Sequence, residues 1–240
     1  MIKMKQMPLL ILFITFSFIS SNAMINKLIN NGSYNTKKST IEIIGNLLFS
    51  YGYEASFVAG VLGNIYHEGT IGKFESSAYI SHPEWEPEYL VYMDQLYGYR
   101  TKYSGKNICE VSMNELGNLL NQLRKDGWNK GKFGLGCIQW TGSRTYDLYQ
   151  IYKKECQGSD YISLDQATNA EGKMIISELR GDYSYIYNQW KSDNPITDTP
   201  LAAYNAGHIL TMKYEVPNNT SNQAKIRGRT ANDMYIIMTS

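Results

Sequence analysis

A helix-start signal that recurs along the chain constrains the fold more than any other feature of the sequence. In three places a serine is followed three positions later by Glu or Gln, just before an apolar run: Ser39 with Glu42, Ser112 with Glu115, and Ser163 with Gln166. This spacing is that of the capping box, in which each side chain satisfies a backbone N–H at the start of a helix. The sequence therefore predicts three helix starts.

Apolar residues recur at helical spacing in further segments, at about 55–67, 144–155, 183–191, 200–207 and 222–238. Alternating patterns typical of strands are confined to short pieces around 131–140. Residues 69–112 are dense in Gly, Pro, Tyr and Glu, and we expect a long irregular stretch there that serves function or is partly ordered. We predict a mainly α, α+β fold, in which a helical domain carries a small hairpin or loop insert lining a cleft.

The N-terminus has the layout of a secretory signal. Lys3 and Lys5 precede an apolar stretch over 8–19, and small residues follow up to Ala23. The apolar stretch is shorter than the roughly 20 residues that cross a bilayer, although an uncleaved anchor stays an alternative. We expect 1–23 to be a signal peptide, 24–38 a polar linker and 39–240 one catalytic domain of a secreted, monomeric protein with no membrane span after removal of the signal.

Composition and residue spacing exclude several other functions. The chain has 23 basic and 22 acidic residues, so no basic excess favours nucleic acid as a partner. His67, His82 and His208 lack the spacing of a zinc protease site, and we expect no metal and no cofactor. The three cysteines, Cys109, Cys137 and Cys156, could form one disulfide, and the sequence does not choose the pair.

Glu68 is the first candidate for a catalytic group. Counted at 100° per residue, it continues the apolar stripe of Phe57, Val61 and Ile65 at the end of the helix predicted over 55–67. Partial burial and the negative end of the helix dipole both favour the protonated carboxyl. A protonated glutamic acid can donate a proton to a glycosidic oxygen. The alternative is a solvated glutamate at a frayed helix end that Gly69 terminates.

Three motifs and a C-terminal segment resemble known lysozyme-like proteins. The segment Val58-Ala-Gly-Val-Leu-Gly-Asn-Ile-Tyr-His-Glu68 looks like the catalytic helix of the phage tail lysozymes, and Phe133-Gly-Leu-Gly-Cys-Ile-Gln-Trp-Thr-Gly-Ser-Arg144 resembles their Gly-rich loop. Ala202-Ala-Tyr-Asn-Ala-Gly207 is similar to a motif of the lytic transglycosylases, a related branch of the superfamily. Tyr214-Glu-Val-Pro217 followed by Arg229 looks like the C-terminal end of the phage tail lysozyme domain. Together the motifs cover residues 40–238 in the family's order.

The resemblance implies a role for each matching residue. Glu68 would be the general acid in cleavage of peptidoglycan between N-acetylmuramic acid and N-acetylglucosamine. Gln139 and the loop backbone would hold sugar hydroxyls and N-acetyl groups, and Trp140 would lie along the cleft. Tyr204 would hold the Glu68 carboxyl, and Asn205 would join the substrate-binding set. The alternative for Trp140 is packing in the core. The alternative for Tyr204 and Asn205 is a structural contact that joins the end of a helix to its neighbour.

The sequence departs from the family just after Glu68. An insertion brings Glu75, followed by Ser76, into view as a second candidate acid, although no helical apolar stripe precedes it. A second carboxylate is usual in glycoside hydrolysis, and the candidates lie in the irregular stretch: Glu75, Glu84, Glu86 and Asp94. A lytic transglycosylase needs none, because the C6 hydroxyl of the sugar attacks. Both reaction types stay open.

Two other functions remain as alternatives. Cys137 and His208 could form the thiol and imidazole pair of a peptidoglycan amidase, although a disulfide or a buried thiol is the simpler expectation for Cys137 in its glycine-rich setting. A non-catalytic glycan-binding or toxin-like module would also use the 13% of aromatic residues. A pure binder, however, gains nothing from a buried acid that costs stability.

Overall fold

The fold is seen in a computed structural model, which describes residues 20–76, 79–80, 90–94, 98–217 and 219–240. The side chains of 77–99 and the residues 1–19 lie outside this description, so the predicted signal peptide falls almost wholly outside it. The chain forms two compact units. The helical unit combines the residues up to His67 with Asp182–Ser240, and the middle unit is Glu68–Gly181. The predicted mainly α fold is confirmed.

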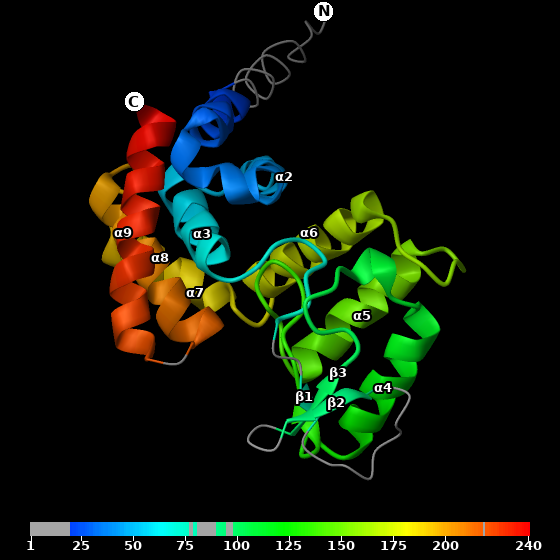
Figure 1. The fold of residues 1–240 in the computed structure, drawn as a ribbon. Helices are drawn as coiled ribbons and strands as arrows, with labels where there is room; N and C mark the ends of the chain where they lie inside the picture. The colour runs from blue at the N-terminus through cyan, green and yellow to red at the C-terminus, as the bar shows by residue number, and fades with distance from the viewer. Residues whose placement is uncertain (1–19, 77–78, 81–89, 95–97, 218) are drawn as a thin grey trace, which may run out of the picture. The chain divides into compact units, whose positions relative to one another are not determined.

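The helical unit contains the helices from both ends of the chain (Figure 1). Its elements are η1 (Gly32–Lys37), α2 (Lys38–Ser50), α3 (Ala55–His67), α7 (Ser184–Asp193), α8 (Pro200–Leu210), η4 (Thr211–Glu215) and α9 (Thr220–Thr239). The helix predicted over 55–67 is confirmed to the residue. Thr199 caps α8 by accepting a hydrogen bond from the Ala202 backbone, and Pro200 occupies the first turn, where its missing N–H costs nothing.

Small residues bring α3, α8 and α9 into close contact. A Cβ atom on Gly60 of α3 would lie 2.9 Å from the Gly207 nitrogen of α8, and one on Gly63 would lie 3.1 Å from the Ala231 nitrogen of α9. Asn64 lies between them, buried, and donates to the carbonyl oxygens of Gly60 and Gly207. These two glycines of α3 therefore admit a neighbouring backbone.

The linker predicted over 24–38 is wrong. Residues 20–30 are helical, η1 and α2 follow almost at once, and the side chains of Ile25 and Leu28 are fully buried. A Cβ atom on Gly45 of α2 would meet the Ile25 side chain, and Lys27 donates to the carbonyl oxygen of Ser240. The polar composition of the segment concealed one buried apolar face.

The middle unit contains α4 (Met113–Lys125), α5 (Ser143–Glu155), α6 (Leu164–Arg180) and the short helix η3 (Ile108–Glu110). It also holds a four-stranded antiparallel sheet in the order β2-β3-β1-β4, formed by β1 (Tyr79–Ile80), β2 (Leu90–Asp94), β3 (Gly98–Thr101) and β4 (Gly131–Lys132) (Figure 1). Three of these strands lie in the stretch expected to be irregular. β1 pairs with β3 and β4, which are distant in sequence, so alternation in a short window did not predict it.

The three capping signals have different outcomes. Ser163 and Gln166 form a complete capping box at the start of α6. Ser112 caps α4, although Glu115 bonds Lys102 in place of the Ser112 backbone. Ser39 lies inside α2, because η1 leads directly into that helix. Among the described residues, none of the helices is both long and apolar enough to cross a membrane.

Candidate functional site

Glu68 directly follows the last residue of α3 and is half-buried. The next residue fixes the chain against the glycine-rich loop, which we define as 133–140. The Gly69 backbone nitrogen donates to the Cys137 carbonyl oxygen at 3.2 Å. A Cβ atom on Gly69 would lie 2.8 Å from Nε2 of Gln139. Glu68 therefore emerges beside Gln139, one of the predicted substrate-binding residues.

The segment that follows Glu68 runs antiparallel to the glycine-rich loop. The Gly136 nitrogen donates to the Lys73 oxygen at 2.9 Å, and the Glu75 nitrogen donates to the Gly134 oxygen at 3.0 Å. Between these bonds Phe74 pairs with Leu135 as an isolated bridge. Residues 105–108 bond the other edge of the same segment, so Glu68 and Glu75 are at opposite ends of one segment that two partners support.

A tight turn shapes the glycine-rich loop. Leu135 and Trp140 exchange two backbone hydrogen bonds of 3.0 Å. Within the turn, Gly136 has φ 84° and Gln139 has φ 54°, and the second value is unusual for a residue with a side chain. The Gln139 amide compensates by donating to the carbonyl oxygens of Gly136 and Lys73. Its N–H groups therefore hold the loop, and Oε1 takes no part in these two bonds.

Internal packing explains the glycines of this loop. A Cβ atom on Gly136 would lie 2.8 Å from the Trp140 ring and 3.0 Å from the Glu171 carboxylate. One on Gly134 would lie 2.7 Å from Oε1 of Gln139 and 3.0 Å from Oε2 of Glu75. In the structure, side chains of the protein itself occupy the space beside these glycines.

Glu171 of α6 holds both segments, and sequence reasoning missed it. Its fully buried carboxylate accepts hydrogen bonds from the backbone nitrogens of Gly72 and Cys137 and from the Tyr152 hydroxyl. Burial raises the pKa of Glu171, against these hydrogen bonds, which lower it. The available signal was an acid inside the apolar face of α6, between Ala170 and Ile175.

Trp140 does not lie along a cleft as predicted. Its side chain has 0% exposure, and its indole nitrogen donates to Glu178 of α6 at 2.9 Å. The same carboxylate pairs with the Arg144 guanidinium at 2.7 and 2.9 Å. A wholly covered indole offers no face to a sugar ring, so the structure contradicts the predicted role. Trp140 and Arg144 instead fasten the glycine-rich loop to α6.

The environment of Glu75 suits a proton donor better than its sequence suggested. The residue is half-buried, and burial raises the pKa of its carboxyl, partly offset by a hydrogen bond from the Gly134 backbone. Such a shift favours the neutral form, which a general acid requires. Of the other predicted carboxylates, Glu84 and Glu86 lie outside the described residues, as does the side chain of Asp94 in β2.

Tyr204 and Asn205 lie in α8 and are half-buried. The Tyr204 ring is stacked near that of His208, with centroids 6.1 Å apart. Asn205 donates to Oδ1 of Asn194 at 2.8 Å, and Asn194 in turn donates to the Trp190 carbonyl at 2.7 Å. Asn205 thus joins α8 to the end of α7, which is the structural role given above as the alternative to substrate binding. The predicted contact between Tyr204 and Glu68 stays a prediction.

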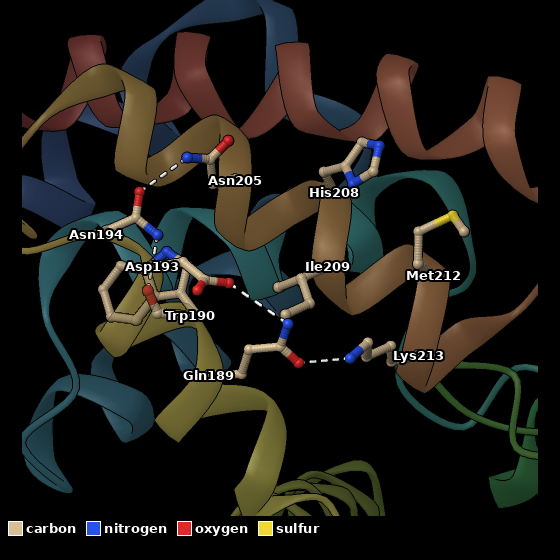
Figure 2. Close-up of a pocket in the computed structure, with 9 residues that line it drawn as sticks. All are labelled: Gln189, Trp190, Asp193, Asn194, Asn205, His208, Ile209, Met212 and Lys213. Carbon is tan, nitrogen blue, oxygen red and sulfur yellow. Dashed lines mark hydrogen bonds between the residues drawn. The ribbon is translucent and has the colours of Figure 1, made fainter.

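Asn205 also lines a pocket of about 420 Å³ in the helical unit (Figure 2). The pocket lies between α7 and the α8–η4 segment, and its walls mix amide, charged and apolar side chains. They come from Gln189, Trp190, Asp193, Asn194, Asn205, His208, Ile209, Met212 and Lys213. No motif indicated this pocket beyond Asn205 itself.

The environment of Cys137 does not favour a nucleophile. The Cys137 side chain has 0% exposure, and it hydrogen-bonds the Glu171 carboxylate. A reactive thiolate needs an electropositive, partly exposed setting. Burial also raises the pKa of Cys109 and Cys156. Within the described part of the chain, no three His, Cys, Asp or Glu side chains come together as a metal site would require.

Comparison with known proteins gives one match. A model of the phage tail lysozyme family matches residues 39–238. No curated protein and no solved structure matches the chain. The matched range covers α2 to α9 and so includes both units, the end of α3 at Glu68, the glycine-rich loop and α8.

Proposed function

Because the chain belongs to the phage tail lysozyme family, we propose that it cleaves the glycan strand of peptidoglycan between N-acetylmuramic acid and N-acetylglucosamine, with Glu68 as the general acid. Membership of the family makes the protein a lytic enzyme in general terms, with peptidoglycan as its substrate. One observation carries the assignment of the acid. Glu68 emerges from the end of α3 directly beside the glycine-rich loop, with Gly69 bonded to Cys137.

The chemistry follows from the position of the carboxyl. A protonated Glu68 would donate its proton to the glycosidic oxygen as the bond to the anomeric carbon breaks. Oε1 of Gln139 would accept a hydrogen bond from a sugar hydroxyl, because the amide N–H groups already serve the loop. The resulting cation is attacked either by water or by the C6 hydroxyl of the same sugar. In the second case Glu68 also takes back a proton, and no second carboxylate is needed.

Glu75 is the candidate for a second carboxylate. The Gly134 backbone donates a hydrogen bond to its carboxyl, but burial raises its pKa and favours the neutral form, which cannot take a proton from water. We therefore assign no base role to Glu75 in either reaction. We favour the hydrolase, because the family is one of lysozymes.

Digestion of purified peptidoglycan tests the proposal. We expect new glycan ends, analysed by mass spectrometry: reducing ends from attack by water, or anhydro ends from attack by the C6 hydroxyl. Peptides released without new glycan ends would support the amidase alternative and overturn the proposal. Activity should persist in EDTA and after alkylation of exposed thiols, since neither a metal nor a thiolate takes part.

Two matched substitutions test the acid. Glu68→Gln keeps the shape of the side chain and removes the titratable proton, so turnover should fall by about 10²-fold or more, while folding and cell-wall binding persist. Glu75→Gln should leave most of the activity in place. If the two variants behave the other way round, Glu75 is the acid. If neither loses activity, the assignment of a lysozyme-like mechanism fails.

We also propose that the protein is secreted, from the arrangement of Lys3, Lys5, the apolar stretch over 8–19 and Ala23. Cleavage after Ala23 would leave the buried residues Ile25 and Leu28 in the mature protein. N-terminal sequencing of exported protein should begin at Met24. Export as an uncleaved chain would contradict this proposal without affecting the enzymatic one.

A further inference from the structure

The pocket between α7 and the α8–η4 segment carries opposite charges on its wall. Gln189 lies between Asp193 and Lys213 (Figure 2): its amide nitrogen donates to Oδ2 of Asp193 at 3.4 Å, and its oxygen accepts a hydrogen bond from Nζ of Lys213. The amide therefore keeps the carboxylate and the ammonium apart while orienting both. Asp193 and Lys213 are exposed, so a ligand can reach them.

The remaining walls supply two amides, an imidazole and an apolar patch. Asn205 uses its nitrogen to bond Asn194, and Figure 2 shows its oxygen pointing away from that bond. Ile209 and Met212 also line the pocket, and Met212 is 38% exposed. The volume of about 420 Å³ is within the range of about 300–1,000 Å³ that is common for small-ligand sites.

These features fit a short peptide better than a sugar ring. Sugar sites usually present the open face of an aromatic ring, but Trp190 is only 1% exposed and donates its indole N–H to the Ala202 carbonyl. Separated opposite charges complement a zwitterion, which a neutral N-acetylated sugar is not. The amide oxygen of Asn205 matches a peptide N–H, and the apolar patch matches small aliphatic side chains.

We propose that this pocket binds the peptide stem of peptidoglycan. The assignment of this substrate rests on the proposed function. An ammonium group of the stem contacts Asp193, and a carboxylate of the stem contacts Lys213. Asn205 accepts from a stem amide, and alanine methyl groups contact Ile209 and Met212. The protein thereby engages the peptide of its polymeric substrate at a site that takes no part in the cleavage chemistry.

Nuclear magnetic resonance with the full chain tests the proposal. Trp190 is the one tryptophan of the sequence outside 68–181, so its indole N–H signal reports on this pocket. The probe is a synthetic stem pentapeptide, L-Ala-γ-D-Glu-L-Lys-D-Ala-D-Ala, titrated into the Glu68→Gln variant. A peptide-free oligomer of N-acetylglucosamine is titrated in parallel.

We expect the pentapeptide to shift the Trp190 signal with a saturable dependence on concentration. Asp193→Asn and Lys213→Met should each weaken this binding about tenfold, since each removes one charge that faces the ligand. The control Lys225→Met removes an exposed charge on α9 outside the pocket and should leave the affinity unchanged.

Three results would overturn the proposal: no shift of Trp190 with the peptide, binding that both pocket variants retain, or a Trp190 shift with the sugar oligomer alone. The titration needs no catalysis. Peptide binding without glycan cleavage would therefore leave this inference standing while the proposed function fails, and cleavage without peptide binding would do the reverse.

Discussion

Glu171 and Glu178 lie seven residues apart on α6, and each carboxylate holds a different part of the candidate site. Glu171 accepts from the backbone on both sides of the antiparallel pair, at Gly72 and Cys137. Glu178 binds the Trp140 indole and the Arg144 guanidinium. Residues with no predicted role in chemistry thus position the segment that begins at Glu68.

Substitution of Glu171 tests this positioning role. Glu171→Gln places an NH2 group among four donors, so at least one buried donor loses its acceptor, at a cost of about 1–3 kcal/mol. We expect the free energy of unfolding, measured in urea, to fall by that amount, and glycan cleavage to fall with it. Glu115→Gln is the control, because Glu115 is 51% exposed in its pair with Lys102 and should change stability by less than about 1 kcal/mol. Equal losses in the two variants would contradict the role given to Glu171.

The pH dependence of stability has a defined sign at Glu54. Burial alone would raise the pKa of Glu54, but hydrogen bonds from Lys191 and Tyr187 outweigh it and lower the pKa. A lowered folded-state pKa contributes stability above the unfolded value of about 4.3, and this contribution disappears as the pH falls through the folded value. We therefore expect Glu54→Gln to lower the Tm at pH 7 and to have little effect at pH 3. A difference that grows on acidification would show that these bonds do not favour the carboxylate.

At the scale of elements, the packing of α3 on α8 depends on the absence of one methyl group. A Cβ atom on Gly60 would lie 2.5 Å from the Cβ of Ala206 and 2.9 Å from the Gly207 nitrogen. Real Cβ atoms do not approach backbone so closely, so the two helices would have to separate. Because Glu68 follows α3, a shift of that helix would also move the candidate acid.

Gly60→Ala should therefore destabilise the protein, even though alanine favours an isolated helix by up to about 1 kcal/mol. We expect a net loss of about 1–3 kcal/mol, as for other overpacked cores, in chemical unfolding. Gly32→Ala is the matched control, because nothing lies within 4 Å of the position its Cβ would take. Unchanged stability of Gly60→Ala would mean that α3 and α8 are not held at this contact.

At the scale of the whole molecule, the segment before α2 belongs to the folded protein. Ile25 and Leu28 have 0% exposure, and Ile29 and Tyr34 are buried as well. We expect a chain that starts at Met24 to be as stable as the 240-residue chain. In a chain that starts at Lys38, the free energy of unfolding should fall by several kcal/mol, because each buried aliphatic side chain contributes about 1.5–3 kcal/mol. Thermal unfolding of both chains checks this. Equal Tm values would show that residues 24–37 do not stabilise the fold, as a linker would not.

The sequence by itself determined the features that depend on near neighbours along the chain. The end of α3 at His67, the capping box at Ser163 and the Thr199 cap with Pro200 are local, because each hydrogen bond joins residues a few positions apart. The ordered motifs at Glu68, the glycine-rich loop and α8 also sufficed to predict the family. The prediction failed at 24–38, where helical packing depends on contacts with α2 and the C-terminus.

Only the tertiary structure decided which side chains are covered and which partners they meet. Trp140 is core because Glu178, 38 positions later, accepts its indole N–H. Glu171 reaches Gly72 across 99 positions, and β1 pairs with β4, which lies beyond α4 in the chain. The pocket beside Asn205 exists because α7 and α8 pack together. Burial and pairing at such distances depend on how helices and loops pack in space, and no window of sequence contains both partners.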